Sequence, residues 1–407
     1  MSTIPNCRIC GSSELIDAID LGEQPWGNHF LSRTEVGLEQ RYPLRVVWCP
    51  LCCGAQLDFT VPKEVMFVKH TYLSGTTKSL TAHFSRVAKS ITERYFQSAF
   101  GKGTCKVLDI GSNDGTLLRQ FRDLGWDVTG VESSVIAAEI ANSAGIRTIN
   151  TFYNEKAQDD LNESFDLIHA SGVFFHLEEL HSVTRAVKSA LLPNGVFVVQ
   201  FLYMKSIMVN GAFDQIYHEH LLYYTLRSLG ALLEQHGLEI FDADADPIHG
   251  GSIIAHIGHQ GLRVQSTRLK GYIEAESISG CNELKSYQEL QRKAAALRER
   301  DLIFLDSCSQ KGRRVYGLGA PVKGNTLLNF LGVGEQHIQC LVERNPLRKG
   351  TYAPGSHIPV LMEDEISGPP DVYYVLAWNF KQEILERYRS DIDAGVEFYF
   401  PIDPKVL

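Results

Sequence analysis

Nine residues decide the fold of this chain: Val107-Leu108-Asp109-Ile110-Gly111-Ser112-Asn113-Asp114-Gly115. They form an apolar run that ends in an acid and then breaks into a turn closed by a second glycine. Beyond the turn, Leu117, Leu118 and Phe121 recur at the spacing of a helix. The pattern predicts a strand, a tight turn and a helix start, so the backbone N–H groups of the turn would face a bound ligand. Such a corner is typical of nucleotide-binding proteins.

A second acid supports this interpretation. Trp126–Glu132 predicts another strand that ends in a carboxylate, about twenty residues after the turn. A carboxylate at that place usually accepts hydrogen bonds from ribose hydroxyls. The turn itself reads G-S-N-D-G and has an acid two residues before its first glycine, so it differs from the G-x-G-x-x-G of dinucleotide enzymes.

The turn resembles the first motif of class I S-adenosylmethionine methyltransferases. Asn113 stands where many members carry glycine, and Asn is the residue other than glycine that best tolerates a positive φ. Phe165–Ser171 then reads as the fourth strand, and Leu191–Val199 resembles the Pro-Gly turn and fifth strand of that fold. A generic α/β turn with an exposed acid is the alternative. The resemblance implies a doubly wound α/β domain in which S-adenosylmethionine is bound by Asp109, Gly111, Asn113, Gly115, Glu132 and Ser171.

Composition excludes several classes of protein. The chain has 407 residues, 44% of them hydrophobic and 10% aromatic, which fits two or three globular domains. A net charge of −9 argues against nucleic acid as a partner, and the only basic cluster is Lys311–Arg314. Met1–Cys7 lacks the features of a secretory signal, and no apolar run reaches the ~18–20 residues that span a bilayer. We therefore expect a soluble, cytoplasmic protein with no nucleic acid or membrane partner.

The cysteines predict a structural zinc site. Two C-x-x-C pairs, Cys7 with Cys10 and Cys49 with Cys52, can supply four thiolates to one tetrahedral zinc ion. Such a closed site would stabilise a module too small to bury enough apolar surface by itself. Cys53 is a possible substitute for Cys52, although the regular spacing favours Cys52. The alternative is four thiols that bind no metal.

The chain divides into three expected domains. Residues 1–75 would form the zinc-binding module, in which residues 20–31 read as a loop. Residues 76–260 would form the methyltransferase domain, which starts with an amphipathic helix near Ser79. Residues 261–407 would form a second, Rossmann-like α/β domain. This domain opens with a long helix from Asn282 to Leu305 and then repeats the strand and glycine turn at Arg314–Ala320.

Over essentially its whole length the chain resembles one family, the C-methyltransferases that act on nucleotide-linked 4-keto-6-deoxyhexoses. One departure stands after the matching loop His249–Ser252, where Ile253 and Ile254 occupy positions at which the family commonly has an Arg. The segments that carry the resemblance are Tyr217–Leu221 (Y-H-E-H-L), Tyr316–Asn329, Glu343–Pro346 and Leu376–Asn379.

The resemblance implies a reaction and a substrate. The sugar would be held by the C-terminal domain as its nucleotide diphosphate, with TDP expected, and methylated at a carbon beside the 4-keto group, C3 being favoured over C5. Lys323 and Asn325 near a helix N-terminus suit a pyrophosphate. The substrate-binding candidates are Lys323, Asn325, Trp378 and Asn379.

The catalytic candidates lie in two clusters. Tyr217 or His220 would remove the proton, Glu219 would orient His220 or bind a sugar hydroxyl, and His176 or Tyr72 would stabilise the oxyanion. Alternatives stay open: a metal site or a structural cluster at residues 217–220, a core or capping role for His176, and packing for Tyr72. At the level of the whole chain, the competing hypotheses are O- or N-methylation and a binding protein without turnover.

Overall fold

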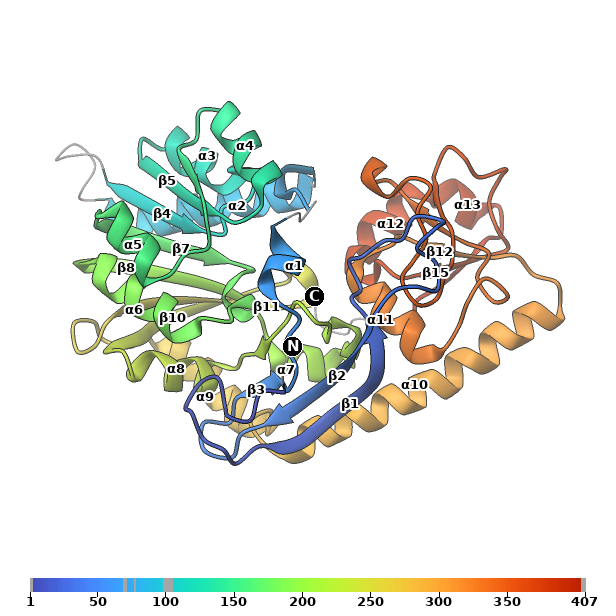
Figure 1. Cartoon of the computed structure of the whole chain (residues 1–407), viewed down its shortest axis with the longest axis horizontal. Helices are drawn as coiled ribbons and strands as arrows, with labels where there is room; N and C mark the ends of the chain where they lie inside the picture. Colours follow the sequence, from blue (N-terminus) through green and yellow to red (C-terminus); the bar gives the residue numbers. More distant parts are fainter. Residues whose placement is uncertain (1–2, 69–71, 77, 98–104, 404–407) are drawn as a thin grey trace.

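The computed structural model describes residues 3–68, 72–76, 78–97 and 105–403. These residues form three sheets, of four, seven and five strands. Figure 1 shows the seven-stranded and five-stranded sheets in two lobes, with β1, β2 and α10 running along the base from one lobe to the other. Within the described ranges, no helix combines the length and the apolar character needed to cross a membrane.

The central sheet has the strand order β10-β11-β8-β7-β4-β5-β6. Neighbouring strands pair in parallel, except that β11 runs antiparallel to β8 and to β10. This is the doubly wound α/β fold expected from the sequence. Its strands are β4 (Lys106–Ile110), β5 (Asp127–Glu132), β6 (Thr148–Asn150), β7 (Phe165–Ser171), β8 (Leu191–Leu202), β10 (Leu238–Asp246) and β11 (Ser252–His259).

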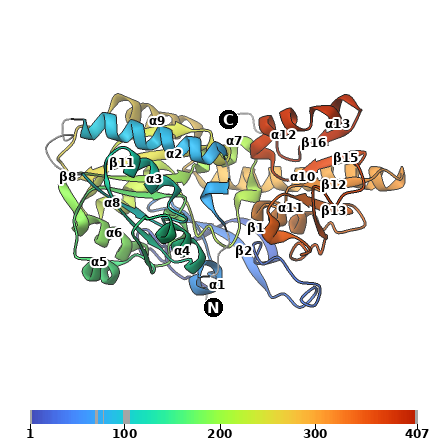
Figure 2. The ribbon, with the colours of Figure 1, turned by 90° about the horizontal axis from the view of Figure 1, so that it is seen from above.

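Helices cover both faces of this sheet. Successive residues of each central strand point to opposite faces, and each face packs into its own hydrophobic core. Val107 and Leu167 pack under α2 and α3, whereas Leu108 and Ile168 pack under α6 and α8. Figure 2 shows α2 and α6 on opposite sides of the sheet. The helices of this domain are α2 (Lys78–Ile91), α3 (Thr116–Asp123), α4 (Val135–Ser143), α5 (Glu155–Leu161), α6 (Leu180–Ala190), α7 (Met204–Asn210) and α8 (Leu226–Glu234).

The N-terminal module forms an antiparallel sheet with the order β1-β2-β3-β9. Its last strand comes from the methyltransferase domain and follows directly on residues 217–221, so the two units share one sheet. The elements are β1 (Ile16–Pro25), β2 (Arg41–Trp48), β3 (Ala55–Leu57), α1 (Lys63–Phe67) and β9 (Leu222–Tyr223).

The prediction of a loop from residue 20 was wrong, because β1 continues to Pro25. In the structure, Gly22 has a φ of 76°, and the pairing with β2 shifts register between Asp20 and Glu23. A bulge of this kind lets a strand pass through residues that would otherwise end it.

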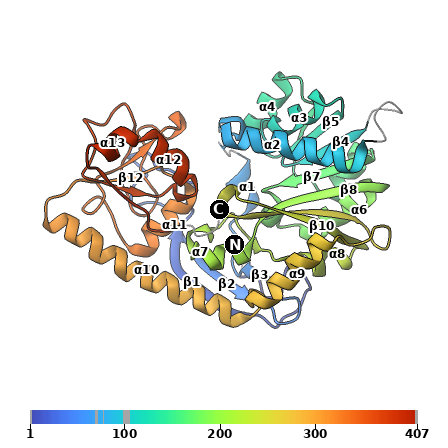
Figure 3. The ribbon, with the colours of Figure 1, turned by 180° about the vertical axis from the view of Figure 1, so that it is seen from behind.

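The C-terminal domain holds five parallel strands in the order β14-β13-β12-β15-β16. Figure 3 shows α10 running beneath both lobes. This helix extends beyond the predicted end at Leu305, because Cys308 continues its buried face. The elements are α9 (Thr267–Ser279), α10 (Leu284–Gln310), β12 (Val315–Leu318), α11 (Val322–Leu331), β13 (Cys340–Glu343), β14 (Val360–Met362), β15 (Val372–Val375), α12 (Lys381–Arg387), α13 (Arg389–Asp393) and β16 (Glu397–Tyr399).

Candidate active site and zinc centre

The turn after β4 has the backbone that the sequence predicts for a ligand-binding corner. Gly111, Asn113 and Gly115 have φ angles of 69°, 50° and 76°. A Cβ on Gly111 would lie 2.4 Å from a methyl group of Val173, so only glycine fits there. Asn113 adopts the positive φ that Asn tolerates best among residues other than glycine. The turn therefore leads into α3 with its N–H groups at the carboxyl edge of the sheet.

Glu132 ends β5 beside this turn. Its carboxylate accepts hydrogen bonds from the N–H of Asn113 at 2.8 Å and from the N–H of Ser134 at 2.6 Å. The side chain is 7% exposed. The two strands that the sequence predicts to carry an acid near their ends therefore lie side by side, and Glu132 is hydrogen-bonded to the turn that follows Asp109.

Asp109 and Ser171 lie at the same edge on neighbouring strands. Asp109 is buried opposite His169 of β7, whose Nδ1 lies 3.4 Å from its Oδ1, and burial raises the pKa of this carboxyl. The Ser171 hydroxyl donates to Gln200 at 3.0 Å, and the same Gln200 oxygen contacts the ring of His83 at 2.9 Å. The cofactor candidates are therefore gathered at one sheet edge, with Asp109 below the surface.

The Asn113 side chain holds the segment that contains Tyr72. Its Oδ1 accepts from the N–H of Ser74 at 2.8 Å, and its Nδ2 donates to the carbonyl of Tyr72 at 2.9 Å. The surrounding protein and the carboxylate of Asp114 raise the pKa of Tyr72 to about 12. Tyr72 therefore stays a phenol at neutral pH and lies beside the cofactor turn.

The Y-H-E-H-L signature forms a tight turn that brings Tyr217 against His220. The N–H of His220 donates to the carbonyl of Tyr217 at 2.9 Å, and the two ring centroids are 3.7 Å apart. The Nδ1 of His220 lies 2.8 Å from the carbonyl of Gln215. A carbonyl only accepts, so Nδ1 carries the proton and Nε2 is the basic nitrogen.

Burial sets the charge state of both rings. It lowers the pKa of His220 to about 3, and it raises the pKa of Tyr217 well above its usual value, with the charge of Glu219 as a second cause. At neutral pH His220 is therefore an uncharged imidazole and Tyr217 an uncharged phenol.

His176 meets His220 although 44 residues of sequence separate them. It ends the short helical turn Phe174–His176 after β7, and its ring centroid is 5.2 Å from that of His220. The ring of Phe67 from the N-terminal module also stacks on His176, with the two ring centroids 5.3 Å apart. No motif in the sequence pointed to Phe67.

Two further members of the signature, His218 and Glu219, contact the N-terminal module. Trp26 donates its indole N–H to Oε1 of Glu219 at 2.9 Å, and Glu219 is only 4% exposed. His218 lies edge-on to Tyr42 at 5.7 Å, and burial lowers its pKa to about 4. His218 thus faces away from the pair formed by Tyr217 and His220.

A second polar cluster joins the signature to the C-terminal domain. Trp378 is fully buried and donates its indole N–H to Asp214 at 2.7 Å, while Nζ of Lys323 lies 3.4 Å from the centroid of the same indole. Burial lowers the pKa of Lys323 to about 7, although the negative charge of Asp214 acts in the opposite direction and raises it. Burial also raises the pKa of Asp214. Asp214 was missed at the sequence level, although it stands three residues before Tyr217.

The remaining expected sugar-binding residues differ in what they contact. Asn325 is 1% exposed and donates to the carbonyl of Gly27 at 2.7 Å. The Oδ1 of Asn379 is buried and has no hydrogen-bond partner among the described residues. Ile253, which stands near the family's Arg position, lies in the core of β11 with no exposure.

The four expected zinc ligands converge. The sulfurs of Cys7, Cys10, Cys49 and Cys52 all lie within 4.8 Å of one another, with two pairs at 3.5 Å. Zinc–sulfur bonds of about 2.3 Å require such spacing in a tetrahedron. The N–H of Gly54 donates to the Cys52 sulfur at 3.4 Å. The donor set fits a structural zinc ion, and Cys52 rather than Cys53 completes the group.

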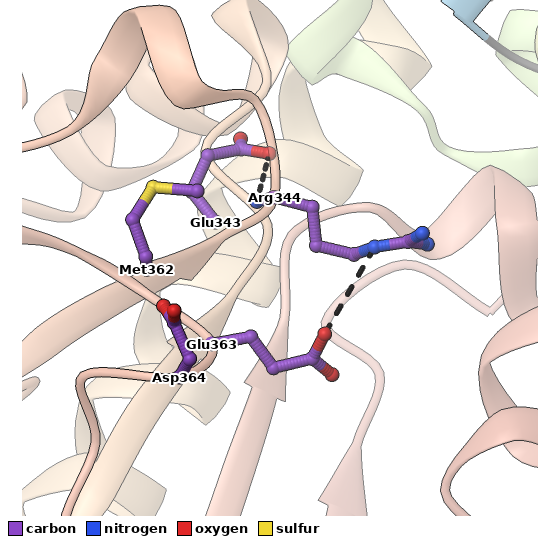
Figure 4. Close-up of a pocket in the computed structure, with 5 residues that line it drawn as sticks. All are labelled: Glu343, Arg344, Met362, Glu363 and Asp364. Atoms are coloured by element: carbon purple, nitrogen blue, oxygen red, sulfur yellow. Dashed lines mark hydrogen bonds and ion pairs between the residues drawn. The ribbon is translucent and has the colours of Figure 1, made fainter.

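A pocket of about 350 Å³ opens at the carboxyl ends of β13 and β14. Its walls include Glu343 and Arg344, and Figure 4 shows the Arg344 guanidinium directed toward Glu363. One oxygen of Glu343 accepts from the N–H of Ala320 at 3.0 Å, directly after the Gly319 turn. The second domain therefore repeats the pairing of a glycine turn with an acid on the next strand.

Comparisons with known proteins cover the three parts of the chain. Residues 247–403 match the family described as C-methyltransferase C-terminal domain. Residues 80–243 match a methyltransferase domain family, and residues 7–67 match a zinc binding domain family.

C-methyltransferase NovU of Streptomyces niveus is 30% identical over 411 residues, which cover 99% of this chain and 97% of the relative. The chain belongs to the C-methyltransferase family. A ubiquinone biosynthesis O-methyltransferase of Azorhizobium caulinodans is 28% identical over 159 residues, or 38% of this chain and 56% of that protein. Among solved structures, the CcbJ methyltransferase from Streptomyces caelestis aligns with a TM-score of 0.34 at 15% identity, covering 44% of this chain and 90% of that chain.

The C-methyltransferase transfers a methyl group from S-adenosylmethionine to carbon, and its N-terminal module binds zinc. The glycine turn and Glu132 suit the nucleoside part of the donor. The pair of Tyr217 and His220 lies on the segment that joins the methyltransferase sheet to the N-terminal sheet.

Proposed function

We propose that the C-methyltransferase acts on a nucleotide-linked 4-keto-6-deoxyhexose and methylates a carbon beside the ketone, with C3 favoured over C5 and TDP as the nucleotide. Similarity to NovU along the whole chain supports a related substrate. One observation carries the catalytic part of the proposal: the Nδ1 of His220 donates to the carbonyl of Gln215, which leaves Nε2 unprotonated beside Tyr217 and His176. Because burial lowers the pKa of His220 to about 3, Nε2 is a weak base in the free enzyme, and proton removal depends on neighbouring donors that stabilise the enolate.

The reaction begins with removal of a proton. A sugar carbon becomes a nucleophile only when a neighbouring ketone accepts the electrons of its C–H bond. Nε2 of His220 takes the C3 proton, and the electron pair forms an enolate whose negative charge rests on the C4 oxygen. The enolate carbon then attacks the sulfonium methyl, the S–CH₃ bond breaks, and S-adenosylhomocysteine leaves as a neutral thioether. The proton on His220 passes to solvent.

The neighbouring side chains complete this chemistry. Tyr217 and Tyr72 stay protonated, so either hydroxyl can donate to the C4 oxyanion, and His176 is a third donor for it. Glu219 orients the sugar by accepting from a hydroxyl, or orients His220. The largest contribution of the protein is to hold the two carbons at the distance and alignment that the transfer needs.

The C-terminal domain supplies the proposed nucleotide-sugar site. The Nζ of Lys323 is buried over the Trp378 ring and has no hydrogen-bond partner among the described residues, so an oxygen of a pyrophosphate or a sugar would supply one. Asn379 offers a buried acceptor. The side chain of Asn325 already donates to Gly27, and that of Trp378 already donates to Asp214. We therefore assign Asn325 and Trp378 a structural role in the site.

The substrate proposal is tested with labelled S-adenosylmethionine and a set of TDP-4-keto-6-deoxyhexoses. We expect the label to appear in the sugar, and mass spectrometry after borohydride reduction should place it on C3. Label on oxygen or nitrogen would replace this proposal with O- or N-methylation. Absence of label from every sugar, in protein that binds both ligands, would favour a binding role.

The base is tested by exchange of the C3 proton with deuterated solvent in the presence of S-adenosylhomocysteine. His220→Ala should abolish exchange and lower kcat strongly, with both Kd values within a few-fold. Tyr217→Phe should retain exchange, because the raised pKa of Tyr217 keeps it protonated at neutral pH, so that no phenolate is available to take the proton. Loss of exchange in Tyr217→Phe alone would transfer the role of base to Tyr217. Full exchange in the double variant would direct the search to His176 and Tyr72.

A further inference from the structure

Trp26 is a residue of the N-terminal module that reaches the catalytic signature. It stands where β1 ends, in the turn Pro25-Trp26-Gly27, and 193 positions separate it from Glu219. Its indole N–H has one polar function, which is to donate. It donates to Oε1 of Glu219 at 2.9 Å, and Glu219 is almost completely buried. The contact therefore fixes the direction of this carboxylate.

The turn that carries Trp26 is held from its other side by the C-terminal domain. Asn325 of α11 donates to the carbonyl of Gly27 at 2.7 Å. A Cβ on Gly27 would lie 3.1 Å from a methyl group and 3.2 Å from the carbonyl of Val322, so the turn packs closely on the start of α11. The indole is thus placed between the helix expected to bind the substrate and the catalytic signature.

Two further contacts from the same module reach the active-site cluster. Phe67 stacks on His176, and Tyr42 packs edge-on against His218. The pairing of Ala55 with Tyr223 then joins β3 to the strand that follows the signature. The module therefore reaches the catalytic turn and its neighbour His176 through several aromatic residues.

We propose that Trp26 is a positioning residue of the C-methyltransferase, which acts by holding the Glu219 carboxylate in the orientation that the reaction needs. Through Trp26 the zinc-binding module is part of the active site rather than only a folding unit. This inference rests on the role given above to Glu219. It makes Trp26 necessary for turnover without placing it in contact with the sugar.

The matched experiment compares Trp26→Phe with Trp48→Phe. Both changes keep an aromatic ring in the N-terminal sheet region and remove an indole N–H. The N–H of Trp48 has no hydrogen-bond partner among the described residues, so its loss should leave kcat unchanged. Trp26→Phe should lower kcat about 10- to 100-fold, the effect of losing one hydrogen bond to a charged group. The Kd of S-adenosylmethionine and the zinc content should stay at the wild-type values, and the Tm should fall by only a few degrees because one buried hydrogen bond is lost.

A double-mutant cycle separates positioning from structure. If Trp26 acts through Glu219, Trp26→Phe should change kcat by less than about twofold in a Glu219→Ala background. Trp26→His keeps a ring N–H and should recover part of the lost kcat. Equal losses in both backgrounds, or wild-type kcat in Trp26→Phe, would overturn the inference. Wild-type kcat in Glu219→Ala alone would instead contradict the role of Glu219 in the proposed function.

Discussion

Glu132 is the residue for which the structure supports the sharpest binding prediction. Its carboxylate lies at the end of β5 and accepts from backbone N–H groups of the cofactor turn and of α4. We expect Glu132→Ala to weaken S-adenosylmethionine binding by about 1.5–3 kcal/mol, the range for a hydrogen bond to a charged group. Calorimetry would measure the loss.

Two controls complete this test. Glu274→Ala removes an exposed acid on α9 and should leave the Kd unchanged. The Kd of the nucleotide-sugar should stay within a few-fold in Glu132→Ala, since the carboxylate faces the cofactor turn. An unchanged Kd for S-adenosylmethionine in folded Glu132→Ala would remove Glu132 from the site.

The charge state of His220 gives a second prediction at this scale. Burial lowers its pKa to about 3, so the free enzyme should hold it as a neutral imidazole across the range from pH 8 to 5. We expect NMR titration of the enzyme with labelled histidine to show no protonation of His220 in that range, with the proton on Nδ1. A titration midpoint near 6.5, the value of a free histidine, would contradict this assignment.

Sequence adjacency decided which site residues could be predicted. Glu132, Tyr217 and His220 belong to short motifs, so a pattern identifies them. Trp26 and Phe67 carry no such pattern, because their partners lie far away in the chain and only the folded sheet brings them together. A partly buried aromatic residue of this kind reads as packing until the group that it contacts is known.

At the level of elements, the zinc knuckles connect the N-terminal sheet to the methyltransferase domain. The carbonyl of Ile9, between the first two ligands, accepts from Gln235 just beyond α8. We expect one zinc ion per chain, and we expect Cys7→Ser to lower zinc content and the yield of folded protein. Elemental analysis and thermal melting would measure both effects.

Cys105→Ser is the matched control, because this cysteine lies outside the group of four. It should keep full zinc content. Complete removal of zinc by a chelator should reduce activity, because Trp26, Tyr42 and Phe67 belong to the module that the metal stabilises. A fully active, soluble protein without metal would show that the site is dispensable for the fold.

The predicted strands agree with the structure where the sequence pattern was simple. The strands β4, β5 and β7 are short apolar runs bounded by turns, and each was found near its predicted position. The error at β1 has a local cause, because a glycine and several charged residues resemble a loop when the partner strand is unknown. Pairing with β2 and the bulge at Gly22 override that local signal.

At the scale of the whole molecule, one continuous core links the parts. Leu44 and Val46 of the N-terminal sheet belong to the same buried cluster as Leu290 of α10 and Val315 of β12. A hydrogen bond between the N-terminal module and the C-terminal domain adds to this core. Glu39, between β1 and β2, accepts from the N–H of Gly355 at 3.0 Å. The composition of the sequence could suggest separate domains but not this shared core, which is made by residues distant in the chain.

Acid should therefore unfold the molecule as a whole, and buried histidines with lowered pKa values, among them His218, His220 and His249, set the direction of the change in stability. Burial lowers the pKa of His218 to about 4 and that of His220 to about 3, whereas an unfolded histidine titrates near 6.5. Below pH 6.5 the unfolded chain binds more protons than the folded one, so stability is full above that value and falls as the pH drops toward 4. Each histidine contributes at most about 1.4 kcal/mol per pH unit.

This prediction is checked by urea unfolding from pH 7.5 to 5, with zinc content measured at every point so that metal loss is recognised. The free energy of unfolding should fall below pH 6.5, and His218→Asn should reduce the slope because one buried titration is gone. The same slope in His218→Asn as in the wild type would mean that His218 binds its proton equally in both states, which is incompatible with a ring that remains buried and uncharged against Tyr42.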